Sequence, residues 1–469
     1  MLFDSAAYVL FLALVVLIFW ALNFRNQNRF LLAASYFFYG WWDWRFLLLM
    51  IASTTLDFII ARRIDASATE RSRKIWLAFS LIANFSVLGF FKYFNFFLDS
   101  SVHVLQVVGF SDLPVSFLKV ILPPGISFYT FQEVAYIVDV YHRKLKPAES
   151  FIDYALFVSL FPHLIAGPIQ KPSHLLPQVQ QPRTFDTGKV FDGLLLILEG
   201  LFRKCVVADN CALIANSAFN GHLGPLSLPI VLLGVYAFAW QIYGDFSGYS
   251  NIARGSAQLL GFHFMVNFRQ PYFAQTLQDF WRRWHISLST WLREYLYIPL
   301  GGNRHASLQT YRNLMLTMLL GGLWHGANWT FVVWGGIHGG GLAAERLVAG
   351  RKSKPRSGFG GIWLRRIFIF HLVCLAWIFF RATSVTAAWD MLASLRFWYW
   401  GPECVAALRF LAFFIAPLFA LDLWLERSGD EYLFASRSVN LRVIAGFAAI
   451  ILVTFFSANQ PNAFIYFQF

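Results

Sequence analysis

The sequence predicts an all-α, polytopic membrane protein with about eleven or twelve transmembrane helices. Of its 469 residues, 58% are hydrophobic and only 13% are charged, whereas soluble domains carry about 25% charged residues. Apolar runs long enough to cross a bilayer recur from one end of the chain to the other. The sequence lacks the short alternating segments that are typical of outer-membrane barrels.

The first apolar runs indicate three helices before the first basic link. The run Ala6–Leu22 is followed by Arg25 and not by a small-residue cleavage site, so we interpret it as a retained first span. The run 30–61 is too long for one simple span and has the aromatic cluster Tyr39–Trp44 near its middle. It therefore predicts two short or tilted helices that meet the interface there. The arginine-rich link 62–74 is expected in the cytoplasm.

The next part alternates between the two sides. A span is predicted at 75–98, and the following loop, 99–118, is poor in Lys and Arg and is expected outside. Another span at 119–141 begins at the turn Leu122–Gly125. The basic loop 142–149 returns to the cytoplasm, which is consistent with an external N-terminus.

The middle of the chain is less regular. Segment 151–170 is apolar but broken by prolines, which predicts a re-entrant piece, and a polar proline-rich loop, 171–189, follows. Further spans are expected at 190–218 and 229–249. Asp245 would lie at membrane depth in the second of them, either as the structural partner of an arginine or as a site residue.

Segment 270–304 mixes arginines with tryptophans and predicts an interfacial helix at the membrane surface. Spans at 313–331 and 332–349 would be joined through Gly335 and Gly336. The basic link 350–362 is expected in the cytoplasm. The last spans are predicted at 363–383, 405–425 and 440–458.

These elements predict one integral-membrane domain, 1–469, without a soluble domain. The net charge of +13 is explained by basic cytoplasmic loops or by attraction to an anionic ligand. A nucleic-acid partner is not expected because no basic soluble domain exists to bind one. The spacing of the four cysteines suggests neither a disulfide framework nor a zinc site.

His325 is the leading candidate for catalysis. It stands in the segment 321–329, GGLWHGANW, where the flanking glycines allow a ligand or another helix to approach the backbone closely. Histidine titrates near neutral pH and suits general-base chemistry. Asn328, three residues on, is expected on the same helical face. The alternative is a buried histidine that only holds a neighbouring helix.

His285 is a second candidate. It follows Arg282 and Arg283, and Arg282 is expected to share its helical face at i, i+3. This pattern suits recognition of an anion or thioester, or merely contact with lipid headgroups. His338 is more simply a structural residue. A zinc site from the three histidines is conceivable, but no metal-ligand spacing such as HExxH is present, so no metal is predicted.

Several segments, in order along nearly the whole chain, resemble the membrane-bound O-acyltransferase family, and more closely its branch for bacterial exopolysaccharide O-acetylation. The core motifs lie at about 120–345. The segments are PPGISFYTFQ at 123–132, FPHLIAGPIQ at 161–170, YGDFSGYSNIA at 243–253, FWRRWHISLSTWLREYLYIPLGGNR at 280–304, YRNLMLTMLLGGLWHGANWTF at 311–331 and WIFFRA at 377–382.

The resemblance implies a helical fold around a central funnel or tunnel. It implies that His325 matches the family's catalytic histidine and that His285 matches its second histidine. The expected donor is acetyl-CoA on the cytoplasmic side, with no bound cofactor. Supporting roles are expected for Asn328, Trp324 and Asp245, and donor binding for Arg282 and Arg283.

The resemblance also implies a place and partners. We expect a multi-pass protein of the bacterial inner membrane that works with exported, periplasmic acetyltransferase-like proteins on a polysaccharide of the alginate or cellulose type. D-alanyl transfer to teichoic acid and O-acyl transfer to peptidoglycan are alternatives within the family. A transporter or polymer-export channel, or a scaffold without activity, would be alternatives from other classes.

Overall fold

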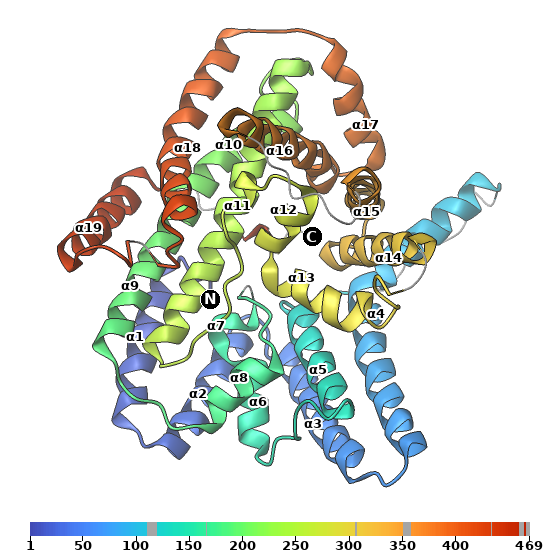
Figure 1. The fold of residues 1–469 in the computed structure, drawn as a ribbon, viewed down its shortest axis with the longest axis vertical. Coiled ribbons are helices and arrows are strands. Elements are labelled where there is room, and N and C mark those ends of the chain that lie inside the picture. Colours follow the sequence, from blue (N-terminus) through green and yellow to red (C-terminus); the bar gives the residue numbers. More distant parts are fainter. Residues whose placement is uncertain are drawn as a thin grey trace. The chain divides into compact units, whose positions relative to one another are not determined.

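The computed structural model describes residues 1–109, 120–165, 167–304, 307–349, 358–432, 434–458 and 464–465. Throughout these ranges the regular elements are helices, and no strand occurs in them (Figure 1). Six helices are long and apolar enough to cross a membrane, and a shorter apolar helix, α1, covers Ala6–Ala21. The all-α, polytopic prediction is confirmed. The six are α3 (Trp44–Ala66), α4 (Glu70–Val107), α11 (Leu228–Leu259), α16 (Phe359–Arg381), α18 (Pro402–Ser428) and α19 (Val439–Phe456).

The other expected crossings correspond to helices that are shorter or more polar than these.

The chain divides into two compact units, each described here by itself. The first unit comprises Met1, 10–185 and 326–328, and the second comprises 2–9, 186–325 and 329–469. The single-domain organisation and the central funnel remain predictions.

In the first unit, the aromatic cluster does separate two helices. Helix α2 (Phe24–Gly40) ends within it, and α3 begins after Asp43, whose side chain caps the new helix by accepting from the Arg45 N–H at 2.9 Å. Helix α4 runs on to Val107, so the expected outer loop is wrong for 99–107, while 110–118 lies outside the described residues.

The rest of the first unit consists of shorter helices. The segment predicted as re-entrant is broken, as expected, because α6 (Phe151–Ser159) and α7 (Phe161–Leu164) are separate. The loop predicted at 171–189 is partly wrong, because it contains α8, Pro172–Gln180. Its first residue is a proline, which is pre-organised for the first turn of a helix. The buried helix α5 covers Ile126–Tyr141.

The second unit is built on α9 (Thr187–Leu201) and α11, which lie side by side (Figure 1). Glycines allow this close approach: a Cβ on Gly200 would stand 2.6 Å from the Gly248 carbonyl oxygen, and one on Gly248 would stand 2.7 Å from that of Gly200. A π-helical turn, Phe202–Ala208, leads from α9 into α10, Asp209–Phe219.

Helix α11 is longer than predicted, since it absorbs the apolar residues after 249 and ends at Leu259. In its apolar window 83% of the residues are buried within the protein, compared with 11% in α19. Helix α11 is therefore a core helix of the second unit, and its polar residues face protein.

The predicted interfacial helix at 270–304 is wrong. The segment forms a 3₁₀ turn (Pro271–Phe273), helix α12 (Leu277–Arg283), helix α13 (Ile286–Leu292) and a π-helical turn. The break between α12 and α13 falls at His285, which has a left-handed backbone with φ 42°. Trp284 and His285 are buried inside the protein and do not face lipid headgroups.

Helices α14 (Ser307–His325) and α15 (Trp329–Ala349) form a hairpin whose turn is 326–328, not Gly335 and Gly336 as predicted. Gly335 instead packs against the Met318 backbone of α14, where a Cβ would clash. After α16, a short helix α17 (Val385–Ala393) precedes α18 and α19. The last three predicted spans are confirmed.

Candidate active site

His325 is the last residue of α14 and is 3% exposed. Its ring packs edge-on against two aromatic rings from other helices. The ring centroids are 5.0 Å apart for Trp334 of α15 and 5.3 Å apart for Phe380 of α16. The helix end places His325 within the protein interior, where its orientation is set by aromatic packing.

The structure brings His285 next to His325, although forty residues separate them in the sequence. Their ring centroids are 6.4 Å apart, and Trp324 packs against both, at 5.8 Å from His285 and 5.1 Å from His325. The three residues, each a candidate from the sequence, therefore form one buried cluster.

Asn267 holds His285 in place and was missed by the sequence analysis. Its Oδ1 accepts from the Ser287 hydroxyl at 2.9 Å and lies 3.2 Å from His285 Nδ1. Its Nδ2 donates to the Ser250 hydroxyl at 3.1 Å, which fixes the amide orientation. His285 therefore carries its proton on Nδ1 and presents the Nε2 lone pair. Burial lowers the pKa of His285 to about 3, so the ring is neutral.

No sequence signal marks Asn267, because it lies eighteen residues before its partner in an irregular segment. Its backbone also contributes, since the Asn267 carbonyl accepts from the Ile286 N–H at 2.9 Å. Together these bonds stabilise the left-handed conformation of His285, which is costly for a residue with a side chain. These contacts of Asn267 become visible only in the folded structure.

We expect Asn267→Ala to lower the free energy of unfolding by about 1–3 kcal/mol, because it leaves buried polar partners unmatched. Turnover should also fall, because His285 loses its orientation. A melting curve in detergent and a thioester-turnover assay measure the two effects. Ser250→Ala is the matched control: it removes only the outer contact and should have the smaller effect on turnover. Equal effects of the two substitutions would contradict the positioning role.

Two sequence expectations about local geometry are wrong. Asn328 does not share a helical face with His325, because α14 ends at His325 and α15 starts at Trp329, which leaves Asn328 in the connecting turn. Arg282 does not share a face with His285, because the left-handed break separates their helices. Arg282 is exposed, whereas His285 is buried.

Arg282 and Arg283 line a polar pocket of about 460 Å³ in the second unit. Side chains from α11, α12 and the end of α18 form its wall. Both arginines and carboxylates line it, so most of its charge is internally balanced. The charged lining residues are Glu199, Arg203, Arg254, Arg269, Asp279, Arg282, Arg283, Glu426, Asp430 and Glu431.

The ion pairs in this pocket distinguish two kinds of arginine. Arg283 is bound by Asp279 at 2.8 Å and by Glu426 at 2.6 Å. Arg203 and Arg254 likewise pair with carboxylates. Among the residues that the structure describes, no carboxylate oxygen lies within 4.0 Å of a side-chain nitrogen of Arg269 or Arg282. These two exposed arginines remain available for an anion.

Asp245 pairs with a lysine rather than an arginine. The Lys204 ammonium bridges Asp245 Oδ1 at 2.9 Å and Asp209 Oδ1 at 2.8 Å. The other Asp245 oxygen accepts from the Ile465 N–H at 2.7 Å. Asp245 is therefore an ion-pair partner inside the protein, and its chain neighbour Phe246 packs against His285 with centroids 4.6 Å apart.

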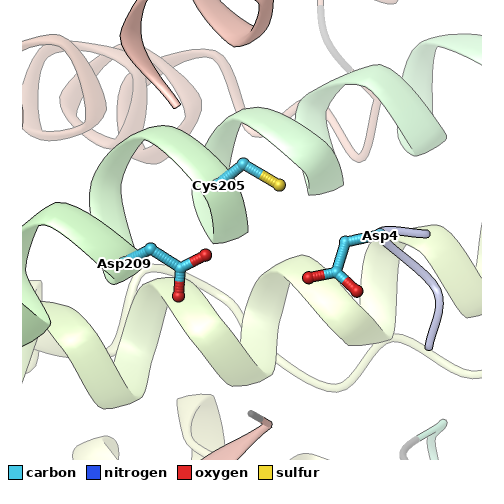
Figure 2. A group of neighbouring side chains, drawn as sticks. All are labelled: Asp4, Cys205 and Asp209. Atoms are coloured by element: carbon cyan, nitrogen blue, oxygen red, sulfur yellow. The ribbon is translucent and has the colours of Figure 1, made fainter. Parts of the chain in front are cut away.

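Asp4, Cys205 and Asp209 form a group beside this ion pair (Figure 2). One potential ligand atom from each residue lies within 4.8 Å of the others. The Lys204 ammonium already balances Asp209, so a cation there would compete with a buried ion pair. Over the described ranges, the ring nitrogens of the three candidate histidines do not converge into a comparable ligand set.

The fold and site define an integral membrane protein with two buried histidines in contact and a pocket of mixed charge on the same unit. Residues 144–380 match the family model of MBOAT, the membrane-bound O-acyltransferase family. The chain belongs to this family and is an O-acyltransferase. The transporter and scaffold alternatives are therefore set aside.

Curated relatives show the same family. The chain is 43% identical to the probable alginate O-acetylase of Azotobacter vinelandii over 401 residues, which cover 84% of this chain and 78% of the relative. It is 38% identical to the peptidoglycan O-acetyltransferase of Helicobacter pylori over 411 residues, 82% of this chain and 76% of the relative. The teichoic acid D-alanyltransferase of Bacillus subtilis is 26% identical over 272 residues, 55% of this chain and 68% of the relative.

Proposed function

We propose that this protein takes acetyl groups from cytoplasmic acetyl-CoA and delivers them, across the bacterial inner membrane, for O-acetylation of an exported polysaccharide. The observation that carries the proposal is the buried contact between His325 and His285, in the same unit as a pocket lined by Arg269 and Arg282, which pair with no carboxylate among the described residues. A histidine supplies the base, and the arginines supply charge for the donor's phosphates.

The expected position of the pocket relative to the membrane supports a cytoplasmic donor. The link before α16 contains Arg351, Lys352, Lys354 and Arg356 and is expected in the cytoplasm. Near the start of α16, Arg366 binds Glu426 near the end of α18 at 2.9 Å, and Glu426 lines the pocket. The pocket therefore belongs to the expected cytoplasmic end of these helices.

His325 lies farther from the expected cytoplasmic end of these helices than the pocket does. Its neighbour Phe380 stands fourteen residues after Arg366 on α16, which is about 21 Å along the helix axis. An extended donor, with phosphates in the pocket and its thioester at His325, would match this separation. The acceptor would then approach His325 from the opposite side.

In the proposed donor complex, Arg282 and Arg269 bind phosphate oxygens. Arg283 does not bind phosphate directly in this complex, because its guanidinium is already paired with the carboxylates of Asp279 and Glu426. Its role is to fix the end of α12 against α18. The original donor-binding prediction for Arg282 and Arg283 is therefore refined to Arg282 and Arg269.

His325 acts as general base in the proposed reaction. The acceptor hydroxyl oxygen attacks the thioester carbonyl carbon, and its proton passes to His325. The carbon–sulfur bond breaks, and the CoA thiolate leaves and takes up a proton. A transient acetyl-histidine is the alternative route. His285, held by Asn267, orients the reacting groups, and Trp324 fixes both imidazoles.

The relatives guide the acceptor and the partners. The names alginate O-acetylase and peptidoglycan O-acetyltransferase both point to a polysaccharide hydroxyl. We propose alginate or cellulose as the type of polymer, with an exported, periplasmic acetyltransferase-like protein completing the transfer. D-alanyl transfer is less favoured, because the D-alanyltransferases match a smaller share of this chain at lower identity.

The test of the proposal uses purified protein in detergent and acetyl-CoA labelled on the acetyl group. Release of free CoA measures turnover, and label retained on the protein reports an acetyl-enzyme. Turnover of acetyl-CoA is expected, increased by membranes that contain the polymer and its exported partner. Turnover only with an aminoacyl thioester on a carrier protein would overturn the acetyl-CoA assignment.

We expect Arg269→Gln combined with Arg282→Gln to raise KM for acetyl-CoA by about tenfold or more, because two charge-assisted hydrogen bonds to phosphate are lost. The effect on kcat should be smaller, since in the proposed complex both arginines bind phosphate oxygens and not the thioester. Steady-state kinetics over a range of acetyl-CoA concentrations separate the two. Lys189→Gln, an exposed charge at the start of α9, is the control for net charge. An unchanged KM in the double variant would contradict the assignment.

A further inference from the structure

Five large aromatic side chains are exposed on the segment that joins α16 to α18. Trp398 is 72% exposed, and Trp389 of α17 is 66% exposed. Phe397, Tyr399 and Trp400 are exposed beside them. Proteins rarely leave so large an apolar area in water, so a patch of this kind indicates a contact surface. We call these five residues the aromatic patch.

Hydrogen bonds fix the backbone of the patch against the core of the second unit. The Phe397 carbonyl accepts from the N–H of Leu228, the first residue of α11, at 2.9 Å. The first N–H groups of a helix have no partner within the helix, so this bond satisfies one of them. The Phe397 N–H donates to the Ser394 carbonyl at 3.0 Å. The rings are therefore exposed on a backbone that is tied to a buried helix.

Helix α17 has three kinds of side chain around its axis. Ala388 and Met391 are buried against the protein. Trp389 and Val385, one helical turn apart, are exposed on the same face. Asp390 is exposed next to Trp389. A helix with an exposed apolar face beside an exposed polar one is suited to the surface of a membrane.

The patch lies where two candidate membrane spans end. Helix α16 ends at Arg381 and α18 begins at Pro402, and both helices are long and apolar enough to cross a membrane. The chain between them passes from α17 to α18 at the top of the view in Figure 1. It therefore lies near one surface of the bilayer. The expected surface is the outer one, because the basic link precedes the other end of α16.

The exposed apolar surface continues from the patch along α18. Leu408 and Phe413 of this helix are exposed, and only 22% of its apolar window is buried within the protein. From the start of α18 inward, the exposed rings change from Trp and Tyr to Leu and Phe. This is the order that membrane proteins show from the interface to the hydrocarbon core. The patch is thus continuous with the surface that α18 presents to lipid.

We infer that the aromatic patch is an interfacial anchor that binds the headgroup region of the lipids at the outer membrane surface. Indole and phenol rings suit this region, because each has an apolar body and a polar group that hydrogen-bonds to headgroups or water. The inference does not depend on the acyl donor. It places an interfacial helix at α17, whereas the sequence predicted one at 270–304.

The anchor also bears on the depth of the candidate active site. Phe380, whose ring packs against His325, is the residue before the last one of α16. Helix α17 begins at Val385, only four residues after the end of α16. Lipid headgroups bound at the patch would hold this end of α16, and His325 with it, close to the outer surface.

The test identifies what touches the rings in the intact membrane. Trp398 and Trp400 are replaced, one at a time, by the photoreactive residue p-benzoylphenylalanine, and bacterial cells that contain the full chain are irradiated. Mass spectrometry then identifies the adducts. The lipid-facing control is the same replacement at Phe413, and the control in a polar pocket is the same replacement at Arg282.

Phospholipid is expected to be the main adduct at positions 398, 400 and 413, with little or none at 282. An exported protein or a polysaccharide as the main adduct at 398 and 400 would overturn the anchor and make the patch a docking surface for that partner. Absence of lipid adducts at 398 and 400, with normal adducts at 413, would overturn it as well.

A second measurement tests the depth of the rings. Melting midpoints are recorded in phosphatidylcholine nanodiscs for three double variants at Trp398 and Trp400. Replacement of both by serine should lower the midpoint, replacement by tyrosine should preserve it, and replacement by leucine should give an intermediate value. Tyrosine keeps an apolar body with a polar group, whereas leucine suits only the hydrocarbon core. A midpoint at least as high with leucine as with tyrosine would contradict a headgroup position.

Discussion

Replacing His325 by alanine is expected to abolish thioester turnover and polymer acetylation while the protein remains folded in the membrane. A positioned general base contributes about 10²- to 10⁴-fold to rate, and an acetyl-histidine route would lose its nucleophile altogether. The imidazole packs against the rings of Trp334 and Phe380, which stay in place in the alanine variant. Removing the imidazole should therefore lower the amount of folded protein in the membrane much less than it lowers turnover.

The control for this substitution is His371→Ala. His371 lies on the exposed side of α16, where its ring bonds to the Tyr236 hydroxyl at 2.7 Å. Labelled acetyl-CoA turnover, in vivo acetylation and the amount of protein extracted from membranes are measured for both variants. Wild-type turnover in His325→Ala would remove His325 from the mechanism. Loss of extractable protein would instead make the histidine a folding residue.

The sequence pointed to the candidate residues of the site because they stand in long motifs with unusual composition. His325 and Trp324 lie in a glycine-flanked segment, and His285 lies in an arginine- and tryptophan-rich one. Hydropathy likewise predicted the long apolar helices at the end of the chain, since burial in lipid demands continuous apolar runs. Both signals are local, and so they can be read without tertiary structure.

Other features depended on tertiary structure. A regular helix through 270–304 was the natural expectation, but the left-handed backbone at His285 ends it. That conformation is stabilised by Asn267, a residue from another segment. The choice between Arg282 and Arg283 as anion ligands also depended on carboxylates of α18, which are far away in the sequence.

The same holds for buried polar residues. Asp245 could have been a site residue or an ion-pair partner, and composition did not decide between them. The structure shows its partner as Lys204, at the π-helical turn that follows α9. For His338, likewise, only the structure shows which aromatic rings surround it, those of Phe280, Trp281 and Trp334. The hydrophobic periodicity of a sequence indicates which face of a helix is buried, but it does not show which residues contact a buried polar side chain.

Lys204→Met is expected to be the most destabilising single substitution outside the histidine cluster. The Lys204 side chain is 1% exposed and binds two carboxylates that are also buried, those of Asp209 and Asp245. Removing one partner from a buried ion pair leaves an uncompensated charge and costs about 3–5 kcal/mol. A large fall in the melting midpoint in detergent, with reduced yield from membranes, is the expected result.

Two further variants make this test specific to the buried charge. Lys189→Met removes an exposed lysine from α9 and should change stability by less than about 0.5 kcal/mol. Lys204→Met combined with Asp245→Asn should recover part of the lost stability, because one of the stranded charges is removed as well. An unaffected melting midpoint in Lys204→Met would mean that the carboxylates find compensation elsewhere.

The effect of Lys204→Met on activity should follow its effect on folding. Asp245 is joined in the chain to Phe246, which packs against His285, so loss of the ion pair loosens the wall of the site. Turnover per folded molecule should fall moderately, and less than in His325→Ala. The two variants thus distinguish a residue that takes part in the reaction from one that supports the structure of the site. His325→Ala should lower turnover alone, whereas Lys204→Met should lower stability and turnover together.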